Sequence, residues 1–236
     1  MSWVEGAKRR AARAAAAHVE SGSVIGLGSG STARYFIQIV GRRLSEGEFG
    51  DILGVPTSVK AAADASESGI PMTSLDEHPE LDLAVDGADQ IDGGLEAIKG
   101  GGGALLREKV VASASRDYIL IADERKLTQR LGEGCPLPVE VLPFSLGTVL
   151  HRMGRMGAKA VLRRRLGGKD PVVTDNGNIV VDADFGAISD PERLEANLKA
   201  IPGVLETGLF VGYADIAYIG TPDSLKKMQR TVIKRR

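Results

Sequence analysis

The segment Ser23–Leu44, with the sequence SVIGLGSGSTARYFIQIVGRRL, indicates the fold class of this chain. It begins with a short apolar run that ends in a glycine-rich turn, as a buried strand does, and it continues with a run typical of a helix. The same order of strand, turn and helix recurs along the chain. Short apolar strands that alternate with helices are typical of a parallel sheet with helices on both faces. We therefore expect an α/β fold.

The alternation continues to about residue 130. An alanine-rich stretch at the start, flanked by Glu5 and Glu20, predicts an amphipathic helix within residues 1–20 rather than a targeting presequence. Further strands are expected at 51–58, 81–89 and 117–123, and further helices at 58–69 and 103–115.

A change of composition follows in LGEGCPLPVEVLPF, residues 131–144, where three prolines and two glycines indicate a domain boundary. We expect residues 1–130 together with 207–236 to form the first domain and residues 131–206 to form a second, smaller α+β domain. Its predicted elements are a helix at 145–157, strands at 158–166, 171–177 and 178–185, and a helix at 190–203 with Asp190 as N-cap and Pro191 in its first turn. Two more strands within 203–224 are expected to return to the first sheet, and the basic tail 226–236 to be a solvated end.

Composition sets limits on the function. The chain has 236 residues, of which 43% are hydrophobic and 26% charged, with a net charge of −1, so it has no strong field to attract nucleic acid. No run approaches the ~20 apolar residues of a membrane span, and we expect no membrane partner. The single cysteine, Cys135, cannot form an internal disulfide, which suggests a reducing cytoplasm. The three histidines are scattered without ligand spacing, and no metal site is expected.

The glycine-rich turn GLGSGSTA, residues 26–33, is a candidate phosphate site. Its main-chain amides can converge on an anion at the start of the following helix, and Ser29, Ser31 and Thr32 add hydroxyl donors. The spacing matches neither a dinucleotide fingerprint nor a Walker loop, so a small phosphate ester fits better. The alternative is a tight turn in which Ser31 or Thr32 caps the helix.

Two aspartates follow the strand expected at 81–89, in the segment VDGADQID. Asp86 and Asp89 are three residues apart in a turn, where their carboxylates could hold sugar hydroxyls, shuttle protons or bind Mg²⁺. The alternative is an Asx-turn, in which each aspartate bonds its own main chain.

Four consecutive glycines, Gly100–Gly103, stand between Lys99 and the helix that carries Glu108. Their amides could approach a developing oxyanion, Lys99 could add positive charge, and Glu108 could act as a general base. The alternative for Glu108 is an exposed helical acid beside Arg107 and Lys109. In open parallel sheets ligands bind beyond the carboxyl ends of the strands, and all three candidate segments are expected there.

In combination, these segments resemble the ribose-5-phosphate isomerase A family. The resemblance covers nearly the whole chain and rests on motifs that occur in order: GLGSGSTA, PTS, VDGAD, KGGGGALLREK, IADERK, LPVEV, VTDNGN, IPGV and IGTPD. It implies the reversible aldose–ketose conversion of ribose 5-phosphate and ribulose 5-phosphate, a step of the non-oxidative pentose phosphate pathway, without metal or organic cofactor. It further implies a Rossmann-like domain with a smaller α+β domain, assembled as a homodimer or homotetramer.

The resemblance also implies roles for individual residues. Glu108 would move a proton between C2 and C1 of the open-chain sugar, and Asp86 and Asp89 would orient its reacting end. Lys99 would stabilise the enediolate together with the main-chain amides of Gly100, Gly101 and Gly102. The phosphate would be held by residues of the first domain, namely Ser29, Gly30, Ser31, Thr32 and Lys126, with Lys8 as a further candidate.

Some positions depart from the commonest family pattern. Gln90 stands where an acid is usual, Gly103 replaces a frequent alanine, Leu106 a small residue and Ser29 a frequent threonine. Two other readings stay open. An amino-sugar-phosphate deaminase would need a histidine near the sugar, and neither motif holds one. A non-catalytic sugar-phosphate sensor would carry a DNA-binding module, for which the sequence offers no segment.

Overall fold

The computed structural model describes residues 2–230, which group into two compact units. The first unit comprises residues 2–88, 107–126 and 212–230, and the second comprises 89–106 and 127–211. The sequence analysis placed residues 89–106 in the first domain, whereas here they group with the second unit. The chain therefore passes between the units within the candidate segments, after Ala88 and after Leu106.

The helices and strands follow the expected alternation. The helices are α1 (Trp3–Ala16), α2 (Ser31–Ser45), α3 (Val59–Glu67), α4 (Leu105–Ala114), α5 (Leu146–Arg155) and α6 (Pro191–Lys199), with short 3₁₀ turns η1 (Glu124–Lys126) and η2 (Pro143–Ser145). The strands are β1 (Val24–Leu27), β2 (Leu53–Pro56), β3 (Leu81–Asp86), β4 (Gln90–Ile91), β5 (Ala97–Ile98), β6 (Ser115–Asp123), β7 (Leu137–Val141), β8 (Lys159–Leu162), β9 (Ile179–Asp184), β10 (Val204–Thr207), β11 (Leu209–Phe210), β12 (Ile216–Gly220) and β13 (Leu225–Gln229).

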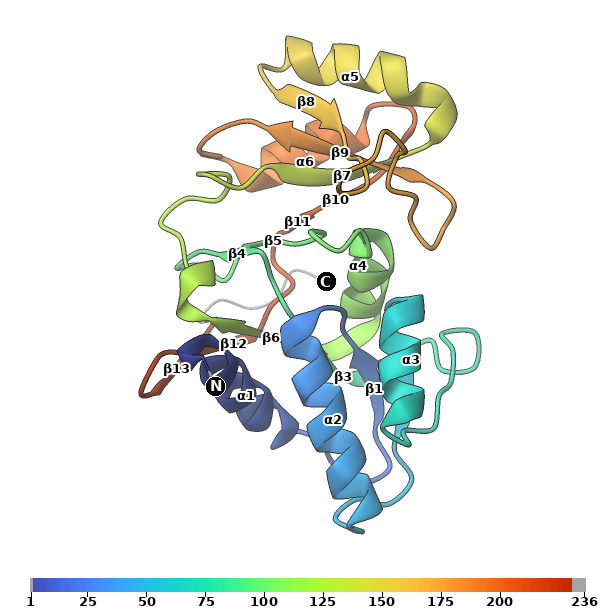
Figure 1. Ribbon diagram of the computed structural model, residues 1–236, viewed down its shortest axis with the longest axis vertical. Helices are drawn as coiled ribbons and strands as arrows, with labels where there is room; N and C mark the ends of the chain where they lie inside the picture. The colour runs from blue at the N-terminus through green and yellow to red at the C-terminus, as the bar shows by residue number, and fades with distance from the viewer. Residues whose placement is uncertain (1, 231–236) are drawn as a thin grey trace. The chain divides into compact units, whose positions relative to one another are not determined.

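The first unit is built on a six-stranded sheet with the order β13-β12-β6-β3-β1-β2. All neighbouring strands are parallel except β13, which pairs antiparallel with β12. Of the two strands expected to return to this sheet from residues 203–224, only β12 does so, because the strands at 204–207 and 209–210 pair within the second unit. Figure 1 shows α2 and α3 in front of β1 and β3. The mostly parallel sheet confirms the predicted α/β fold.

Helices cover both faces of this sheet because successive side chains of a strand point to opposite sides. Ile25 and Leu27 of β1 lie in a buried core with residues of α1, α2 and α3, among them Ala12 and Phe36. Gly26 lies on the other face, where a Cβ would come within 2.5 Å of Val111 in α4. The absence of a side chain at Gly26 thus allows α4 to pack closely on β1.

The second unit contains an antiparallel four-stranded sheet with the order β10-β7-β9-β8 and a small sheet with the order β11-β5-β4. One face of the four-stranded sheet packs against α5 and α6. Its core includes Val139 and Val141 of β7, Met153 of α5 and Leu198 of α6. This unit has the expected α+β character.

One expected strand is absent, and other segments form strands that were not expected. Residues 171–177 form isolated bridges and a turn rather than a strand. The physical reason is that Thr174, Asn176 and Asn178 donate side-chain hydrogen bonds to the buried carboxylate of Glu140. The proline-rich boundary 131–144 contains strand β7, and the start of the basic tail forms β13, an exposed edge strand. The rest of the tail, residues 231–236, lies outside the described residues.

The start of α6 matches its sequence signal. Asp190 caps α6 by accepting a hydrogen bond from the main-chain N–H of Arg193 at 3.0 Å, as predicted.

Within residues 2–230, no helix has both the length and the apolar composition needed to cross a bilayer.

Gly220 tests the close packing of α1 on the sheet. A Cβ at this last residue of β12 would overlap the main-chain carbonyl of Ala7 in α1, which can yield only if the helix shifts. We expect Gly220→Ala to lower the free energy of unfolding by about 1–3 kcal/mol, measured by urea denaturation. At Gly6 in the same helix, a Cβ would lie 3.6 Å from the Arg10 side chain, an ordinary contact. Gly6→Ala should therefore raise the free energy of unfolding by up to about 1 kcal/mol. Equal effects of the two substitutions would contradict this account.

Candidate functional site

The candidate residues of the first unit gather at the carboxyl ends of its parallel strands. Ser29 follows β1, Asp86 ends β3, and Lys126 belongs to η1, directly after β6. Neighbouring parallel strands end at the same edge of a sheet, where ligands of open α/β folds bind. The fold therefore brings these segments of the sequence to one edge.

Asp86 joins the ends of two neighbouring strands. Its Oδ1 accepts hydrogen bonds from the main-chain N–H of Ser29 at 3.0 Å and of Gly87 at 2.7 Å, and the residue is 1% exposed. A Cβ at Gly28 would overlap the Asp86 carboxylate, so glycine is required there by close approach. The bond to Gly87 resembles the predicted Asx-turn, but the bond to Ser29 also ties Asp86 to the glycine-rich turn.

The glycine-rich turn is tied to the next strand through Ser29. Its hydroxyl contacts the hydroxyls of Thr57 at 2.8 Å and Ser58 at 2.7 Å, both at the end of β2. The N-cap of α2 is Gly30, with a φ of 104°, and it makes no side-chain cap bond. The helix therefore begins at Ser31, and neither Ser31 nor Thr32 occupies the N-cap position considered as the alternative.

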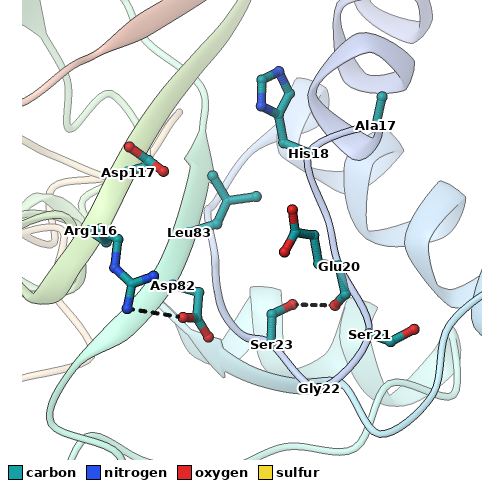
Figure 2. A pocket seen from close by; sticks show the side chains of 10 residues that line it. All are labelled: Ala17, His18, Glu20, Ser21, Gly22, Ser23, Asp82, Leu83, Arg116 and Asp117. Carbon is teal, nitrogen blue, oxygen red and sulfur yellow. Dashed lines mark hydrogen bonds and ion pairs between the residues drawn. The ribbon is translucent and has the colours of Figure 1, made fainter.

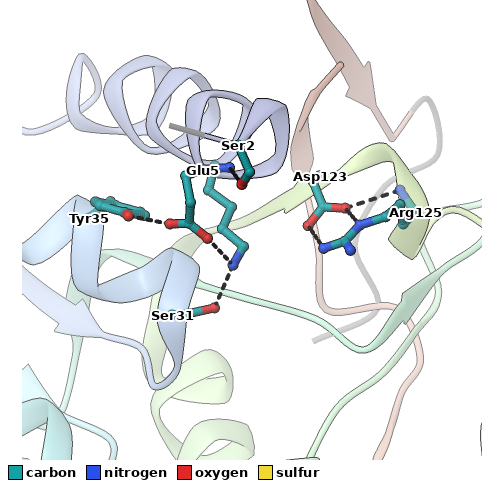
Figure 3. A network of polar contacts seen from close by, with 7 residues as sticks. Ser2, Glu5, Ser31, Tyr35, Asp123 and Arg125 are labelled. Carbon is teal, nitrogen blue, oxygen red and sulfur yellow. Dashed lines mark hydrogen bonds and ion pairs between the residues drawn. The ribbon is translucent and has the colours of Figure 1, made fainter. Parts of the chain in front are cut away.

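Lys8 lies beside the start of α2 and is held there by an acid. Its Nζ donates to the Ser31 hydroxyl at 3.1 Å and to Glu5 Oε1 at 3.0 Å. The other oxygen of Glu5 accepts from the Tyr35 hydroxyl (Figure 3). The hydrogen bond from Tyr35, followed by that from Lys8, lowers the pKa of Glu5 below its ordinary value. The structure thus joins two predicted phosphate ligands, Lys8 and Ser31, in one network.

A second ion pair precedes Lys126. Asp123 is 1% exposed and accepts from Arg125 Nε at 2.6 Å (Figure 3). Burial acts to raise the pKa of Asp123, but the hydrogen bonds and charge of Arg125 outweigh it, and the pKa lies below its ordinary value. Asp123 is thus paired with Arg125 at the end of β6, and Lys126 follows in the same short turn.

Glu108 lies in the first turns of α4 and is 5% exposed. Lys109, beside it, is also 5% exposed, and its Nζ lies 6.0 Å from the centre of the Tyr213 ring. This burial contradicts the alternative of an exposed helical acid. Glutamate side chains are rarely buried to this degree. The role of Glu108 is therefore not to keep the surface of the helix soluble.

In the second unit, the glycine run forms a compact turn. Gly100 and Gly103 have φ values of 101° and 80°, a region that side chains strongly disfavour, and the N–H of Gly103 donates to the carbonyl of Gly100 at 3.0 Å. The N–H of Gly101 donates to Oδ2 of Asp89 at 2.7 Å. A Cβ at Gly101 would lie 2.7 Å from the other oxygen of Asp89. The structure therefore joins two further predicted residues, Asp89 and Gly101.

Lys99 precedes this turn and is 2% exposed. Its main-chain N–H donates to the carbonyl of Gly208 at 2.9 Å, and its Nζ lies 5.3 Å from the centre of the Phe210 ring. Lys99 thus places its buried amino group beside an aromatic face, directly before the glycine turn in the chain.

Gln90 has a structural role that its sequence position did not reveal. Its Nε2 donates to the carbonyl of Glu133 at 2.8 Å, and its Oε1 accepts from the N–H of Gly132 at 2.8 Å. An ionised acid in this place could accept the second bond but could not donate the first. The departure from the family pattern thus serves the packing of one loop.

A hollow of about 420 Å³ lies at the opposite, amino edge of the first unit's sheet (Figure 2). His18 contacts the Tyr218 hydroxyl there at 2.8 Å, and burial lowers the pKa of the imidazole. The lining polar groups largely pair with one another, as Ser23 does with the carbonyl of Glu20 and Arg116 with Asp82. None of the candidate residues lines this hollow.

Several residues that contact the candidates were missed from the sequence. Glu5 and Tyr35 position Lys8, Thr57 and Ser58 contact Ser29, and Arg163 bonds the carbonyls of the glycine turn. Only the PTS motif carried a signal, because it ends a predicted strand. Within residues 2–230, no group of three or more His, Cys, Asp or Glu side chains is placed to hold a metal ion.

Comparisons with known proteins show which family this chain is similar to. A sequence profile of ribose 5-phosphate isomerase A (phosphoriboisomerase A) matches residues 53–224. Ribose-5-phosphate isomerase A of Roseiflexus castenholzii is 48% identical over 222 residues, covering 94% of each chain. The relative of the same name from Pyrococcus horikoshii is 44% identical over 227 residues, covering 96% of this chain and 99% of that protein.

Solved structures are similar over almost the whole chain. A D-ribose-5-phosphate isomerase in complex with phospho-erythronic acid has a TM-score of 0.94 and 44% identity, covering 98% of this chain and 100% of that one. The ribose 5-phosphate isomerase of Plasmodium falciparum has a TM-score of 0.92 and 34% identity, covering 97% of this chain and 100% of that one. On these similarities in sequence and fold, the chain belongs to the ribose 5-phosphate isomerase A family.

Proposed function

We propose that this protein interconverts D-ribose 5-phosphate and D-ribulose 5-phosphate through an enediolate, with Glu108 as the general base. The observation that carries the proposal is the burial of Glu108 in the first turns of α4, directly after the glycine turn in the chain. In a member of this family, that residue type in that place fits a base that moves a proton between C2 and C1.

The reaction needs two chemical functions besides the base. As the proton leaves the sugar carbon, negative charge develops on its oxygen, and this charge must be stabilised. Lys99 supplies a buried positive charge, and the glycine turn supplies main-chain N–H donors with no side chain in front of them. These groups need no reorganisation during the reaction, because the turn is already formed.

Asp86 and Asp89 orient the reacting end of the sugar in this proposal. Each carboxylate has one oxygen that accepts main-chain N–H groups, from Ser29 and Gly87 for Asp86 and from Gly101 for Asp89. Bonds of this kind fix the direction of a carboxylate. Fixed carboxylates can accept hydrogen bonds from sugar hydroxyls and help protons move between the two reacting oxygens.

The phosphate serves as a remote handle. Ser29, Gly30, Ser31 and Thr32 offer hydroxyls and main-chain amides at the start of α2, and Lys8 and Lys126 add positive charge. The hydrogen bond from Lys8 to Ser31 supports this assignment, because it places a cation at the helix start before the ligand arrives. Binding energy from this end of the substrate can be used to position C1 and C2.

The ligand of one solved relative fits the same chemistry. Phospho-erythronic acid carries a phosphate and a carboxylate. The two oxygens of that carboxylate share a negative charge, as the oxygens of an enediolate do. We expect this acid to be a competitive inhibitor here. We also expect a homodimer or homotetramer in the cytoplasm and a reaction that uses neither a metal nor an organic cofactor.

Replacing Glu108 tests the assignment of the base. We expect Glu108→Gln to lower kcat by about 10²–10⁴-fold, because the amide cannot accept the proton. The measurement is conversion of ribose 5-phosphate by purified protein in EDTA, which also tests for a metal that the chelator can remove. Glu46→Gln, at an exposed acid that ends α2, is the matched control and should leave the rate unchanged.

The other outcomes of this experiment are also informative. An active Glu108→Gln would mean that another group is the base. A wild-type protein that binds ribose 5-phosphate without turning it over would be a sensor and would overturn the proposed function.

Replacing Gly101 tests whether the main chain of the glycine turn meets the substrate. A valine Cβ would lie 2.7 Å from an Asp89 oxygen and would also stand in front of the turn. We expect Gly101→Val to lose at least about 100-fold in kcat/KM while its melting temperature falls by no more than about 4 °C, which corresponds to ~1 kcal/mol. Gly93→Val, in the exposed hairpin loop before β5 where a Cβ meets nothing within 4 Å, is the control. A collapse of the melting temperature together with activity would indicate a structural role instead.

Glu5→Gln tests the phosphate handle. The amide loses the charge that holds Lys8 near Ser31, so we expect KM for ribose 5-phosphate to rise by about 3- to 10-fold, or roughly 0.6–1.4 kcal/mol, with a smaller change in kcat. Because the pKa of Glu5 is lowered, its ionised form stabilises the folded state above the ordinary glutamate value of about 4.3. The difference in unfolding free energy between wild type and Glu5→Gln should therefore be constant near pH 7 and shrink as the pH falls below that value. An unchanged KM would show that Lys8 does not help to bind the phosphate.

A further inference from the structure

The glycine turn has a cationic partner that the proposed mechanism does not use. Arg163 follows β8, and its Nη1 donates to the carbonyl of Gly100 at 2.8 Å and to the carbonyl of Gly101 at 3.0 Å. One guanidinium nitrogen thus bonds two consecutive peptide groups. All of these residues belong to the second unit.

The guanidinium of Arg163 is itself held in place. Asp182 of β9 accepts from Nε at 2.9 Å and from Nη2, so that its two oxygens face two donors of the fork. The main chain of Arg163 is fixed as well, because its N–H donates to Val180 at 2.8 Å and its carbonyl accepts from Val172 at 2.9 Å. A paired, anchored arginine has lost most of its rotamer freedom before any ligand binds.

Peptide geometry determines what this contact does to the turn. In a trans peptide group the carbonyl and the following N–H point in opposite directions. When Arg163 fixes the carbonyls of Gly100 and Gly101, it also directs the N–H groups of Gly101 and Gly102 away from itself. The bond from Gly101 N–H to Asp89 at 2.7 Å shows that the first of these amides does point to a carboxylate oxygen.

We propose that Arg163, oriented by Asp182, is a positioning residue that directs the amide of Gly101 at Asp89 and the amide of Gly102 at the negative charge of the enediolate. This inference rests on the proposed function and adds to it a residue pair that does not touch the substrate. The positive charge of Arg163 also polarises both peptide groups, which makes their N–H groups stronger donors.

The turn has other supports, so the role of Arg163 can be separated from folding. The N–H of Gly103 bonds the carbonyl of Gly100, and the N–H of Lys99 bonds the carbonyl of Gly208. The left-handed backbone of Gly100 and Gly103 further limits the shapes open to the turn. Loss of Arg163 should therefore change the direction and strength of the amides more than the stability of the unit.

The test compares Arg163→Met, Arg163→Lys and Asp182→Asn with the wild type. We expect Arg163→Met to lower kcat by about 10- to 100-fold with KM within about twofold, a smaller loss than the 10²–10³-fold typical of removing an oxyanion donor itself. Arg163→Lys, which keeps the charge but not the fork, should recover part of the rate. The inhibition constant of phospho-erythronic acid should rise in proportion to the loss in kcat/KM, whereas that of inorganic phosphate should not change.

The double variant Arg163→Met with Asp182→Asn gives the sharpest result. If Asp182 acts only through Arg163, the double variant is no slower than Arg163→Met alone, whereas independent structural effects would add. Arg164→Met is the matched control, since this neighbouring arginine is exposed and donates to the carbonyl of Lys169 rather than to the glycine turn. An unchanged kcat in Arg163→Met, additive losses in the double variant, or a rate loss matched by a lower melting temperature would each overturn the proposal.

A second measurement does not depend on turnover. Hydrogen exchange of the peptide that contains Gly100–Gly103, followed by mass spectrometry, should be faster in Arg163→Met than in the wild type, with the rest of the unit unchanged. If the wild type lacked isomerase activity, the proposed function would fail, but exchange and calorimetric binding of phospho-erythronic acid would still report whether Arg163 sets these amides. Identical exchange in wild type and variant would rule out the positioning role.

Discussion

The hydrogen bonds of Asp86 are the contact on which the edge of the first unit depends. Its Oδ1 accepts a hydrogen bond from the amide of Ser29, which follows β1, and another from the amide of Gly87, which follows β3. These bonds fix the ends of two neighbouring strands relative to each other. The contact exists only because residue 28 is glycine. Once Ser29 is fixed in this way, its hydroxyl can reach Thr57 and Ser58 beyond β2. One buried carboxylate thus orders three strand ends.

Both units hold their cations with acids. Glu5 holds Lys8 beside Ser31, and Asp182 holds Arg163 beside the glycine turn. Lysine and arginine side chains each lose roughly 2 kcal/mol of rotamer entropy when they are fixed. An acid that fixes the cation during folding removes this cost from the binding of substrate. In the proposed mechanism the acids therefore favour catalysis by preorganisation, without touching the substrate.

The sequence predicted the parts of this protein that depend on local pattern. The alternation of apolar strands and helices predicted the parallel sheet, and the glycine-rich turn and Asp86 do lie at the ends of its strands, as expected. The glycine run does not: it follows β5 of the small antiparallel sheet in the second unit, although it was expected at the end of a parallel strand. Long-range pairing was not predictable. Strand β7 was not expected because prolines lie in it and beside it. It tolerates Pro138 because this residue pairs with Asp182 of β9 and lies beyond the part of the strand that pairs with β10. The hydrogen bonds from Arg163 to Gly100 and Gly101 join residues more than sixty positions apart, and no local pattern predicts them.

The four consecutive glycines now have different explanations. Gly100 and Gly103 need left-handed backbone angles, and Gly101 leaves room for Asp89. Gly102 has neither constraint, since its φ is ordinary and a Cβ there would meet nothing within 4 Å. The fold therefore gives no reason for glycine at this position. The proposed mechanism does give one, because a side chain there would hinder the approach of a sugar oxygen to the Gly102 amide. Arg163, in the proposed positioning role, directs this same amide.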